Sequence, residues 1–225
     1  MNSPIELGFD HRFVASTAPE AERGPTLLLL HGTGGDGASL LQLGYTLSPP
    51  SALLSPTGKV REGGAARFFR RLAEGVFDVA DLRLRTRQLA SFVRDAITAY
   101  GLDPARIVAV GYSNGANITA SMLLSGESVL AGAALFRAMV PFEPSQPADV
   151  HGAPVLLCSG TSDPIATPVE TARLTELLTA AHARVDVHRE PVGHQLVMGD
   201  IKAATDWVQR EFPPSAPRLN PGVQH

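Results

Sequence analysis

Gly111-Tyr112-Ser113-Asn114-Gly115 stands directly after the apolar run 106–110 (RIVAV) and directly before the helix-capable segment 116–120 (ANITA). The pattern is a serine between two glycines, at the point where a β-branched strand turns into a helix. Glycine has no Cβ, so the backbone can approach closely at Gly111 and Gly115. Such a turn exposes the serine hydroxyl, and the free N–H groups of the following helix point to the same place. The motif in this setting predicts that Ser113 is a nucleophile.

Two further candidate residues follow Ser113 along the chain, first an acid and then a histidine. Asp163 stands in the loop after a buried strand predicted at 153–160, and His194 in the loop after a strand predicted at 185–190. In a parallel sheet these loops meet at the edge that carries Ser113. Histidine, with an unperturbed pKa of about 6.5, can accept the serine proton, and aspartate orients the imidazole. An isolated Asp-Pro or Gly-His is usually only a loop, but their joint occurrence predicts a catalytic triad of Ser113, Asp163 and His194.

A glycine-rich loop follows the first strongly apolar segment. The run 25–30 (PTLLLL) is typical of a central strand covered on both faces, and it ends in His31-Gly32-Thr33-Gly34-Gly35-Asp36-Gly37. We expect the backbone N–H groups of Thr33 and Asn114 to form an oxyanion hole. A phosphate-binding loop is the weaker alternative, because no Lys-Ser or Lys-Thr follows and neither glycine spacing fits. We expect His31 to support the loop and not to act as a base.

These segments, together with 54–60 (LSPTGKV), 67–71 (RFFRR) and 75–78 (GVFD), resemble the α/β-hydrolase superfamily. The resemblance is to its small serine carboxylesterase/phospholipase branch, which also contains acyl-protein thioesterases, and within it to a bacterial subgroup of hydroquinone-linked carboxylesterases. It spans roughly residues 20 to 210. Asn114 departs from the glutamine often found after the nucleophile in the broader branch. Because the expected donor is the backbone amide, the departure leaves the predicted oxyanion hole intact.

The order of predicted elements gives the fold class. An antiparallel strand or pair is expected at 5–17, further strands at 27–30, 52–56, 107–110, 132–140, 153–160 and 185–190, and helices at 38–47, 78–100, 114–125, 168–181 and 199–211. This alternation predicts an α/β-hydrolase fold, a mostly parallel, doubly wound sheet flanked by helices. We expect one domain at 1–212 and a proline-rich, disordered tail at 213–225.

Composition excludes several classes of function. The chain has 225 residues, 44% of them hydrophobic and 18% charged, and a net charge of −3. Without a basic stripe we expect no nucleic-acid partner. The single cysteine, Cys158, lies in an apolar run and is expected to be a buried, inert thiol, and no metal or organic cofactor is expected. Lacking a leader sequence or an apolar stretch of membrane-spanning length, the protein is expected to be cytoplasmic, as a monomer or homodimer.

The segment 58–78 lies between a strand end and a helix, where it can cover the pocket. We expect Phe68, Phe69, Phe77 and Val140 to line an apolar wall for the acyl or aryl part of a substrate, with Arg67, Arg70 or Arg71 near its mouth. The alternative is that the phenylalanines belong to the core and the arginines to a solvated face. Asp200 and Asp206, in the last predicted helix, are expected to be solvated charges.

Together these residues predict a serine hydrolase that cleaves carboxylic esters or thioesters of small to medium acyl or aryl groups through an acyl-enzyme. Two alternatives stay open. The same triad could serve a different reaction, as in a perhydrolase or a lyase, or the fold could belong to a non-catalytic ligand-binding protein.

Overall fold

A seven-stranded sheet forms the centre of the protein, for which a computed structural model describes residues 7–214. Its order is β1-β3-β2-β8-β9-β10-β11. The strands are β1 (His11–Val14), β2 (Thr26–Leu30), β3 (Ala52–Pro56), β8 (Ile107–Tyr112), β9 (Gly132–Phe136), β10 (Pro154–Gly160) and β11 (Arg184–Glu190). β1 runs antiparallel to β3, and all the other neighbouring strands are parallel. The predicted fold class, a mostly parallel α/β sheet, is confirmed.

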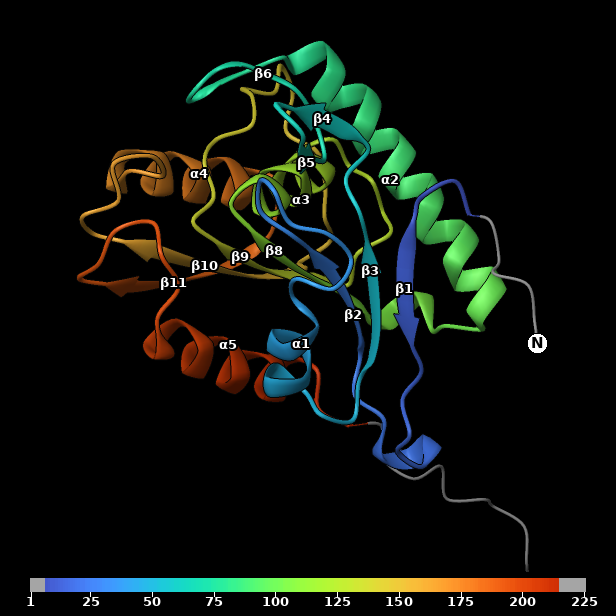
Figure 1. The fold of residues 1–225 in the computed structure, drawn as a ribbon. Helices are drawn as coiled ribbons and strands as arrows, with labels where there is room; N and C mark the ends of the chain where they lie inside the picture. The colour runs from blue at the N-terminus through green and yellow to red at the C-terminus, as the bar shows by residue number, and fades with distance from the viewer. Residues whose placement is uncertain (1–6, 215–225) are drawn as a thin grey trace, which may run out of the picture.

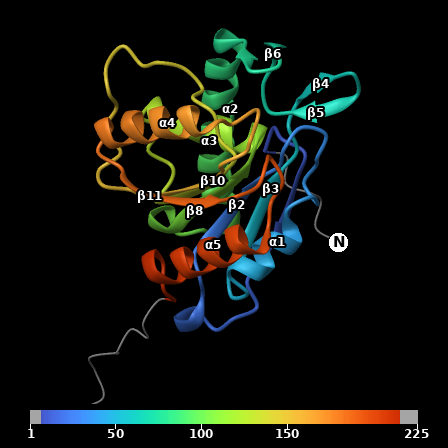
Figure 2. The same ribbon diagram turned by 90° about the vertical axis from the view of Figure 1, so that its left-hand side faces the viewer.

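Helices cover both faces of this sheet (Figure 1). α2 (Val79–Tyr100), α3 (Asn114–Leu124) and α4 (Pro168–Ala180) lie on one face, and α1 (Leu41–Leu47) and α5 (Met198–Glu211) on the other, as the side view in Figure 2 shows. Short 3-10 turns, η1 (Glu20–Glu22) and η2 (Pro104–Arg106), lie in connecting segments. Within β2, Leu28 and Leu30 pack under α2 to α4, whereas Leu27 and Leu29 pack toward α1 and α5. The apolar run of β2 therefore supplies two separate cores, as a strand covered on both faces must.

Residues 58–78, which we call the strap, join β3 to α2 through two small hairpins. The first pairs β4 (Val60–Glu62) with β5 (Ala65–Arg67), and the second pairs β6 (Arg71–Ala73) with β7 (Val76–Phe77). The strap begins at Gly58, where a Cβ would lie 2.4 Å from the carbonyl oxygen of Arg67. Only glycine permits this approach of the two backbones. Sequence analysis predicted no strands in the strap.

Some predicted boundaries were wrong. The strand expected at 132–140 ends at Phe136, because Arg137 adopts a left-handed conformation with φ 57° that leaves the sheet. α1 begins at Leu41 and not at residue 38. Of the predicted tail, residues 215–225 lie outside the described residues, as do residues 5 and 6 of the first predicted strand. Within the described part of the chain, no helix combines the length and the apolar character that a membrane crossing requires.

Candidate active site

Ser113 occupies the turn between β8 and α3 with φ 51° and ψ −111°. An L-residue rarely adopts a positive φ, and such strain persists only where the surrounding structure imposes it. A Cβ at Gly111 would lie 2.7 Å from the Cα of Ala116, and one at Gly115 would lie 1.9 Å from the carbonyl oxygen of Leu30. Both glycines of the motif are thus required by backbone packing around the serine.

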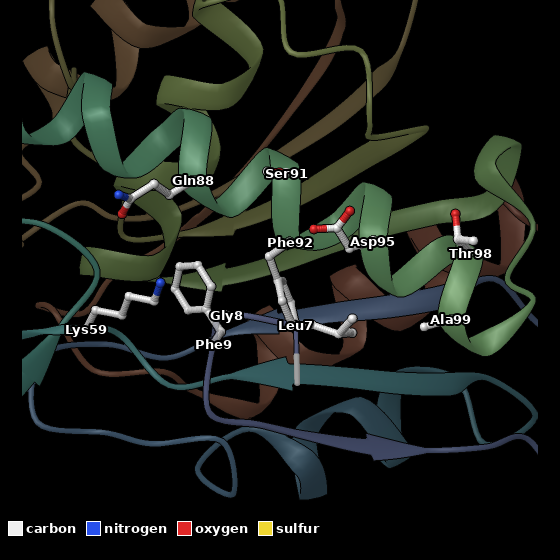
Figure 3. Close-up of a pocket in the computed structure, with 10 residues that line it drawn as sticks. All are labelled: Leu7, Gly8, Phe9, Lys59, Gln88, Ser91, Phe92, Asp95, Thr98 and Ala99. Carbon is white, nitrogen blue, oxygen red and sulfur yellow. The ribbon is translucent and has the colours of Figure 1, made fainter. Parts of the chain in front are cut away.

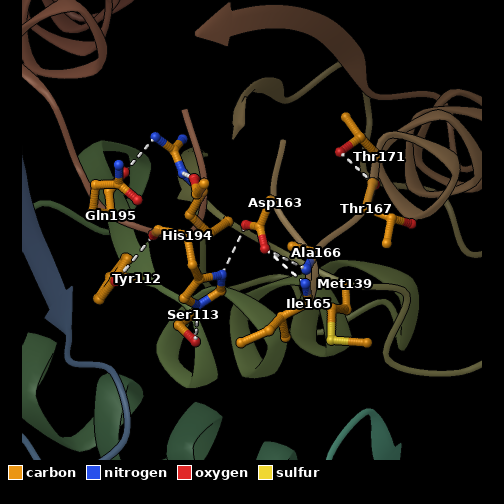
Figure 4. Close-up of polar contacts among 12 residues, drawn as sticks. Tyr112, Ser113, Met139, Asp163, Ile165, Ala166, Thr167, Thr171, His194 and Gln195 are labelled. Atoms are coloured by element: carbon orange, nitrogen blue, oxygen red, sulfur yellow. Dashed lines mark hydrogen bonds and ion pairs between the residues drawn. The ribbon is translucent and has the colours of Figure 1, made fainter. Parts of the chain in front are cut away.

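His194 bridges Ser113 and Asp163 (Figure 4). The Nε2 atom of His194 lies 2.9 Å from Ser113 Oγ, and its Nδ1 atom lies 2.8 Å from Asp163 Oδ2. A carboxylate only accepts hydrogen bonds, so Nδ1 donates to Asp163 and Nε2 keeps its lone pair toward the serine hydroxyl. The structure therefore brings the three predicted residues together in the tautomer that general-base catalysis requires.

The other oxygen of Asp163 fixes the orientation of its carboxylate. Oδ1 accepts hydrogen bonds from the backbone N–H groups of Ile165 (2.8 Å) and Ala166 (3.0 Å). The Asp163 side chain is fully buried, whereas that of His194 is partly exposed. Asp163 thus has defined partners on both oxygens and presents only Oδ2 to the imidazole.

All of these groups lie beyond the carboxyl ends of neighbouring parallel strands. Ser113 follows β8, Asp163 follows β10 and His194 follows β11, as the order of elements predicted. Parallel strands that end at one edge of a sheet deliver their following loops to one crevice. Residues 81 positions apart, such as Ser113 and His194, meet there.

The first hairpin of the strap holds the two predicted oxyanion donors, Thr33 and Asn114. The Thr33 hydroxyl accepts a hydrogen bond from Arg67 Nη1 at 2.6 Å, and the Oδ1 atom of Asn114 accepts one from Phe68 N–H at 2.7 Å. Gly34, next to Thr33, donates its N–H to Ala66 O at 2.9 Å. Asn114 is the first residue of α3, so its own N–H has no partner within the helix. Both residues line the cavity that contains Ser113.

His31 supports the glycine-rich loop 31–37 by joining it to the strap, as expected. Its Nε2 accepts the N–H of Gly58 at 3.0 Å, which leaves the proton on Nδ1 to be donated to Gly32 O at 2.6 Å. The ring is buried and packs against Phe68 with 4.7 Å between ring centroids. Burial lowers the pKa of His31 below its usual value, so the neutral imidazole is the stable form in the folded protein.

This lowered pKa predicts how stability depends on pH. Because burial places the pKa of His31 in the folded protein below that of the unfolded chain, which is about 6.5, the unfolded chain binds more protons as the pH falls, and the free energy of unfolding falls with it. We expect His31→Gln to lower stability at neutral pH but to weaken this pH dependence. Urea unfolding of the wild type and of His31→Gln between roughly pH 7.5 and pH 5 measures the pH dependence of the free energy of unfolding. Parallel curves for the two proteins would contradict a neutral, buried His31.

A cavity of about 250 Å³ lies over Ser113 and His194. Of the predicted pocket residues, Phe77 lines it, whereas Phe68, Phe69 and Val140 do not. Phe68 and Phe69 are buried in the core cluster between the sheet and α2, where their rings contact other apolar side chains. Val140 packs against the same cluster. For these three the prediction was wrong. The other lining residues are Thr33, Arg67, Arg71, Glu74, Gly75, Tyr112, Asn114, Asn117, Arg137, Met139 and Ile165.

The predicted arginines take different positions. Arg67 and Arg71 line the cavity, and both contact the carboxylate of Glu62, at 3.3 Å and 2.7 Å. Arg67 is buried, and burial lowers the pKa of its guanidinium. Arg70 instead points to solvent and pairs with Asp78 at 2.8 Å.

A buried ion pair beside the triad was missed by sequence reasoning. Asp200 was expected to be a solvated charge, but its side chain is fully buried against Arg137, which is also fully buried. Asp206 is exposed as expected. Arg137 and Asp200 are 63 positions apart and neither belongs to a motif, so no local sequence pattern predicts the ion pair. An arginine directly after a wholly apolar strand was the only signal.

Other features of the described residues offer less chemistry. A larger, open hollow of about 670 Å³ lies between α2 and residues 7–9, where Lys59 Nζ approaches the Phe9 ring at 4.1 Å (Figure 3). It shares no lining residue with the cavity at Ser113. Burial raises the pKa of the Cys158 thiol far above its usual value, which keeps it protonated and unreactive. Among residues 7–214, no group of three or more His, Cys, Asp or Glu side chains is placed to hold a metal ion.

Comparison with known proteins agrees with this geometry. Residues 71–211 match the family model described as Phospholipase/Carboxylesterase. The chain is 44% identical to the Bacillus subtilis protein MhqD over 181 residues, which cover 80% of this chain and 90% of the relative. The Bacillus cereus carboxylesterase structure is 44% identical, with a TM-score of 0.87 over 91% of this chain and 95% of that one. A Mesorhizobium loti carboxylesterase structure is 28% identical, with a TM-score of 0.82 over 92% and 99% of the two chains.

The family match spans residues 71–211, and together the matches agree with the resemblance inferred from the motifs. The chain belongs to the phospholipase/carboxylesterase family of α/β-hydrolases, and it is a hydrolase.

Proposed function

We propose that this protein is a serine esterase that hydrolyses carboxylic esters or thioesters through a triad of Ser113, His194 and Asp163. The observation that carries the proposal is the continuous hydrogen-bonded chain from Ser113 Oγ through His194 to Asp163 Oδ2, with 2.9 Å and 2.8 Å between the atoms. Two further observations support the proposal: the chain belongs to a family of hydrolases, and Ser113 is held in a turn with a positive φ.

Catalysis proceeds by two acyl transfers. Ser113 Oγ attacks the carbonyl carbon while its proton passes to His194 Nε2, and the N–H groups of Thr33 and Asn114 stabilise the oxyanion. The tetrahedral intermediate collapses to an acyl-enzyme, and the alcohol or thiol leaves with the proton from His194. Water then attacks the acyl carbon with His194 as base, releasing the acid and restoring the serine hydroxyl.

The cavity supports substrates of small to medium size. Its volume of about 250 Å³ is smaller than the roughly 300–1,000 Å³ of typical small-molecule sites. Phe77, Met139 and Ile165 supply apolar lining, while Arg71 and Glu74 add charged groups. We expect acetyl, butyryl and simple aryl esters to react faster than esters of long fatty acids.

A panel of p-nitrophenyl esters of increasing acyl length tests this function. The expected result is hydrolysis that is fastest for short acyl groups and requires no added metal or cofactor. No hydrolysis of any ester by the folded protein would refute the proposal and favour a ligand-binding role. Peracid formation that exceeds hydrolysis when peroxide is added would identify a perhydrolase instead.

A fluorophosphonate should form one covalent adduct, at Ser113. The activated oxygen attacks phosphorus as it attacks carbon, and the tetrahedral product resembles the intermediate held by the Thr33 and Asn114 amides. Peptide mass spectrometry should locate the adduct in the segment 111–117, and Ser113→Ala should remove it. Adducts on other serines at equal rate would mean that Ser113 is not activated.

A further inference from the structure

Arg137 uses every donor of its guanidinium in hydrogen bonds to other groups of the protein. The side chain is fully buried. Nε donates to Gly193 O at 3.2 Å, and Nη1 donates to Cys158 O and Asp200 Oδ1, both at 3.0 Å. Nη2 donates to Gln195 O at 2.7 Å and Asp200 Oδ2 at 2.5 Å. Five N–H groups thus meet five acceptors, which is the full capacity of an arginine.

Two of these acceptors flank His194. Arg137 binds the carbonyl oxygens of Gly193 and Gln195, the residues on either side of the histidine. The carbonyl of His194 itself accepts the hydroxyl of Tyr112 at 3.1 Å (Figure 4). Three consecutive carbonyls of the histidine loop are therefore held by side chains, and Tyr112 directly precedes Ser113. The backbone that carries the imidazole is therefore anchored at His194 and at the residues on both sides of it.

Asp200 holds the guanidinium in place. Its two oxygens bind Arg137 in a bidentate manner, and Oδ2 also accepts the N–H of Val197, the N-cap residue of α5, at 3.1 Å. The pair joins the end of β9, the end of β10, the histidine loop and α5. The pair acts on the histidine loop through hydrogen bonds to its backbone carbonyls.

Stability alone does not explain this arrangement. A fully buried ion pair is expensive to desolvate, and apolar side chains of similar size can stabilise a fold equally well. Apolar side chains, however, cannot bind the carbonyls of Gly193 and Gln195. Lysine could not replace the planar fork either, because its three donors radiate from one atom.

We propose that Arg137, oriented by Asp200, is a positioning residue that fixes His194 Nε2 toward Ser113 Oγ. The inference rests on the proposed serine esterase function, since it acts through His194. Arg137 touches the cavity, but its five donors are all engaged by protein acceptors. It serves the reaction through the histidine and not through the substrate.

Arg137→Gly tests the proposal. Glycine suits the φ of 57° at this position, and the vacated space adjoins the cavity, so a guanidinium ion from solution can enter. We expect kcat for p-nitrophenyl acetate to fall about 10²-fold with KM changed only a few-fold, because misplacement of a catalytic group acts on turnover. Guanidinium should restore part of kcat, and methylammonium should not. Retention of kcat within threefold, or equal rescue by both ions, would overturn the proposal.

A spectroscopic readout separates positioning from general loss of structure. The low-field proton resonance of the His194–Asp163 hydrogen bond should be sharp in the wild type, and it should broaden or disappear in Arg137→Gly and in Asp200→Asn. Leu178→Ala removes a buried side chain of α4 and is the control. It should lower Tm while leaving the resonance and kcat unchanged below the transition. A resonance unaffected by Arg137→Gly would overturn the proposed positioning role of Arg137.

Failure of the proposed function would look different. Ser113→Ala keeps Arg137, Asp200 and the His194–Asp163 hydrogen bond, so its resonance should remain even though turnover is lost. Full activity of Ser113→Ala would reject the esterase mechanism. The effect of Arg137→Gly on the resonance would then still report whether the guanidinium orients His194.

Discussion

Ser113→Ala should lower kcat/KM for an ester by about 10⁴ or more while the protein keeps its fold. The hydroxyl that is removed is the one that His194 Nε2 meets at 2.9 Å, so no acyl-enzyme can form. Alanine retains the Cβ of serine, so the strain of the positive φ is unchanged and stability should be nearly the same. What remains is the slow reaction of bound ester with water beside the oxyanion donors.

The measurement is a comparison of p-nitrophenyl acetate hydrolysis and urea unfolding for three proteins. Ser91→Ala, on the exposed side of α2, serves as the matched control and should match the wild type in both. Activity of Ser113→Ala within tenfold of the wild type would show that another group is the nucleophile.

Asp163→Asn should lower kcat by about 10⁴, because the amide would place the imidazole proton of His194 on the wrong nitrogen. The N–H groups of Ile165 and Ala166 require an oxygen at the Oδ1 position. The NH₂ group of asparagine must then face His194 Nδ1, which becomes an acceptor. The imidazole proton moves to Nε2, where it blocks removal of the proton from Ser113. The negative charge that stabilises the imidazolium is lost as well.

The test is the rate of ester hydrolysis as a function of pH for Asp163→Asn and for Asp206→Asn, the same change at an exposed position of α5. The wild type and Asp206→Asn should share one pH profile of kcat/KM. Asp163→Asn should have a far lower plateau. A plateau equal to that of the wild type would mean that Asp163 does not orient the histidine.

The sequence predicted the parts of this molecule whose causes are local. Gly111 and Gly115 indicate the turn, because the backbone there approaches too closely for any side chain. Four consecutive leucines indicate that β2 is buried on both faces. Asp163 and His194 could be selected because loops after parallel strands converge on one edge. Their contacts at 2.8 and 2.9 Å agree with that reasoning.

What could not be predicted depends on distant partners. The strap contains strands of only two or three residues, too short for a periodic pattern, and it is stabilised by contacts with Thr33 and Asn114. Nothing in the sequence distinguishes Phe77, which lines the cavity, from Phe69, which does not. The two rings pack against each other with 5.1 Å between their centroids. Asp200 was misjudged because a charge in an amphipathic helix is normally solvated, and its partner Arg137 lies 63 positions away, directly after β9.

The two hairpins of the strap have unequal freedom to change during evolution. Arg67, in the first hairpin, lines the cavity and also binds Thr33, so a substitution that reshapes the cavity there also disturbs Thr33, one of the two proposed oxyanion donors. The second hairpin lines the cavity through Arg71, Glu74 and Phe77, and these side chains have no hydrogen bond to Thr33 or Asn114 among the described residues. New substrate preferences should therefore accumulate in residues 71–77, while 65–68 stay fixed. Libraries built for altered specificity would retain the most active variants if they were confined to that second hairpin.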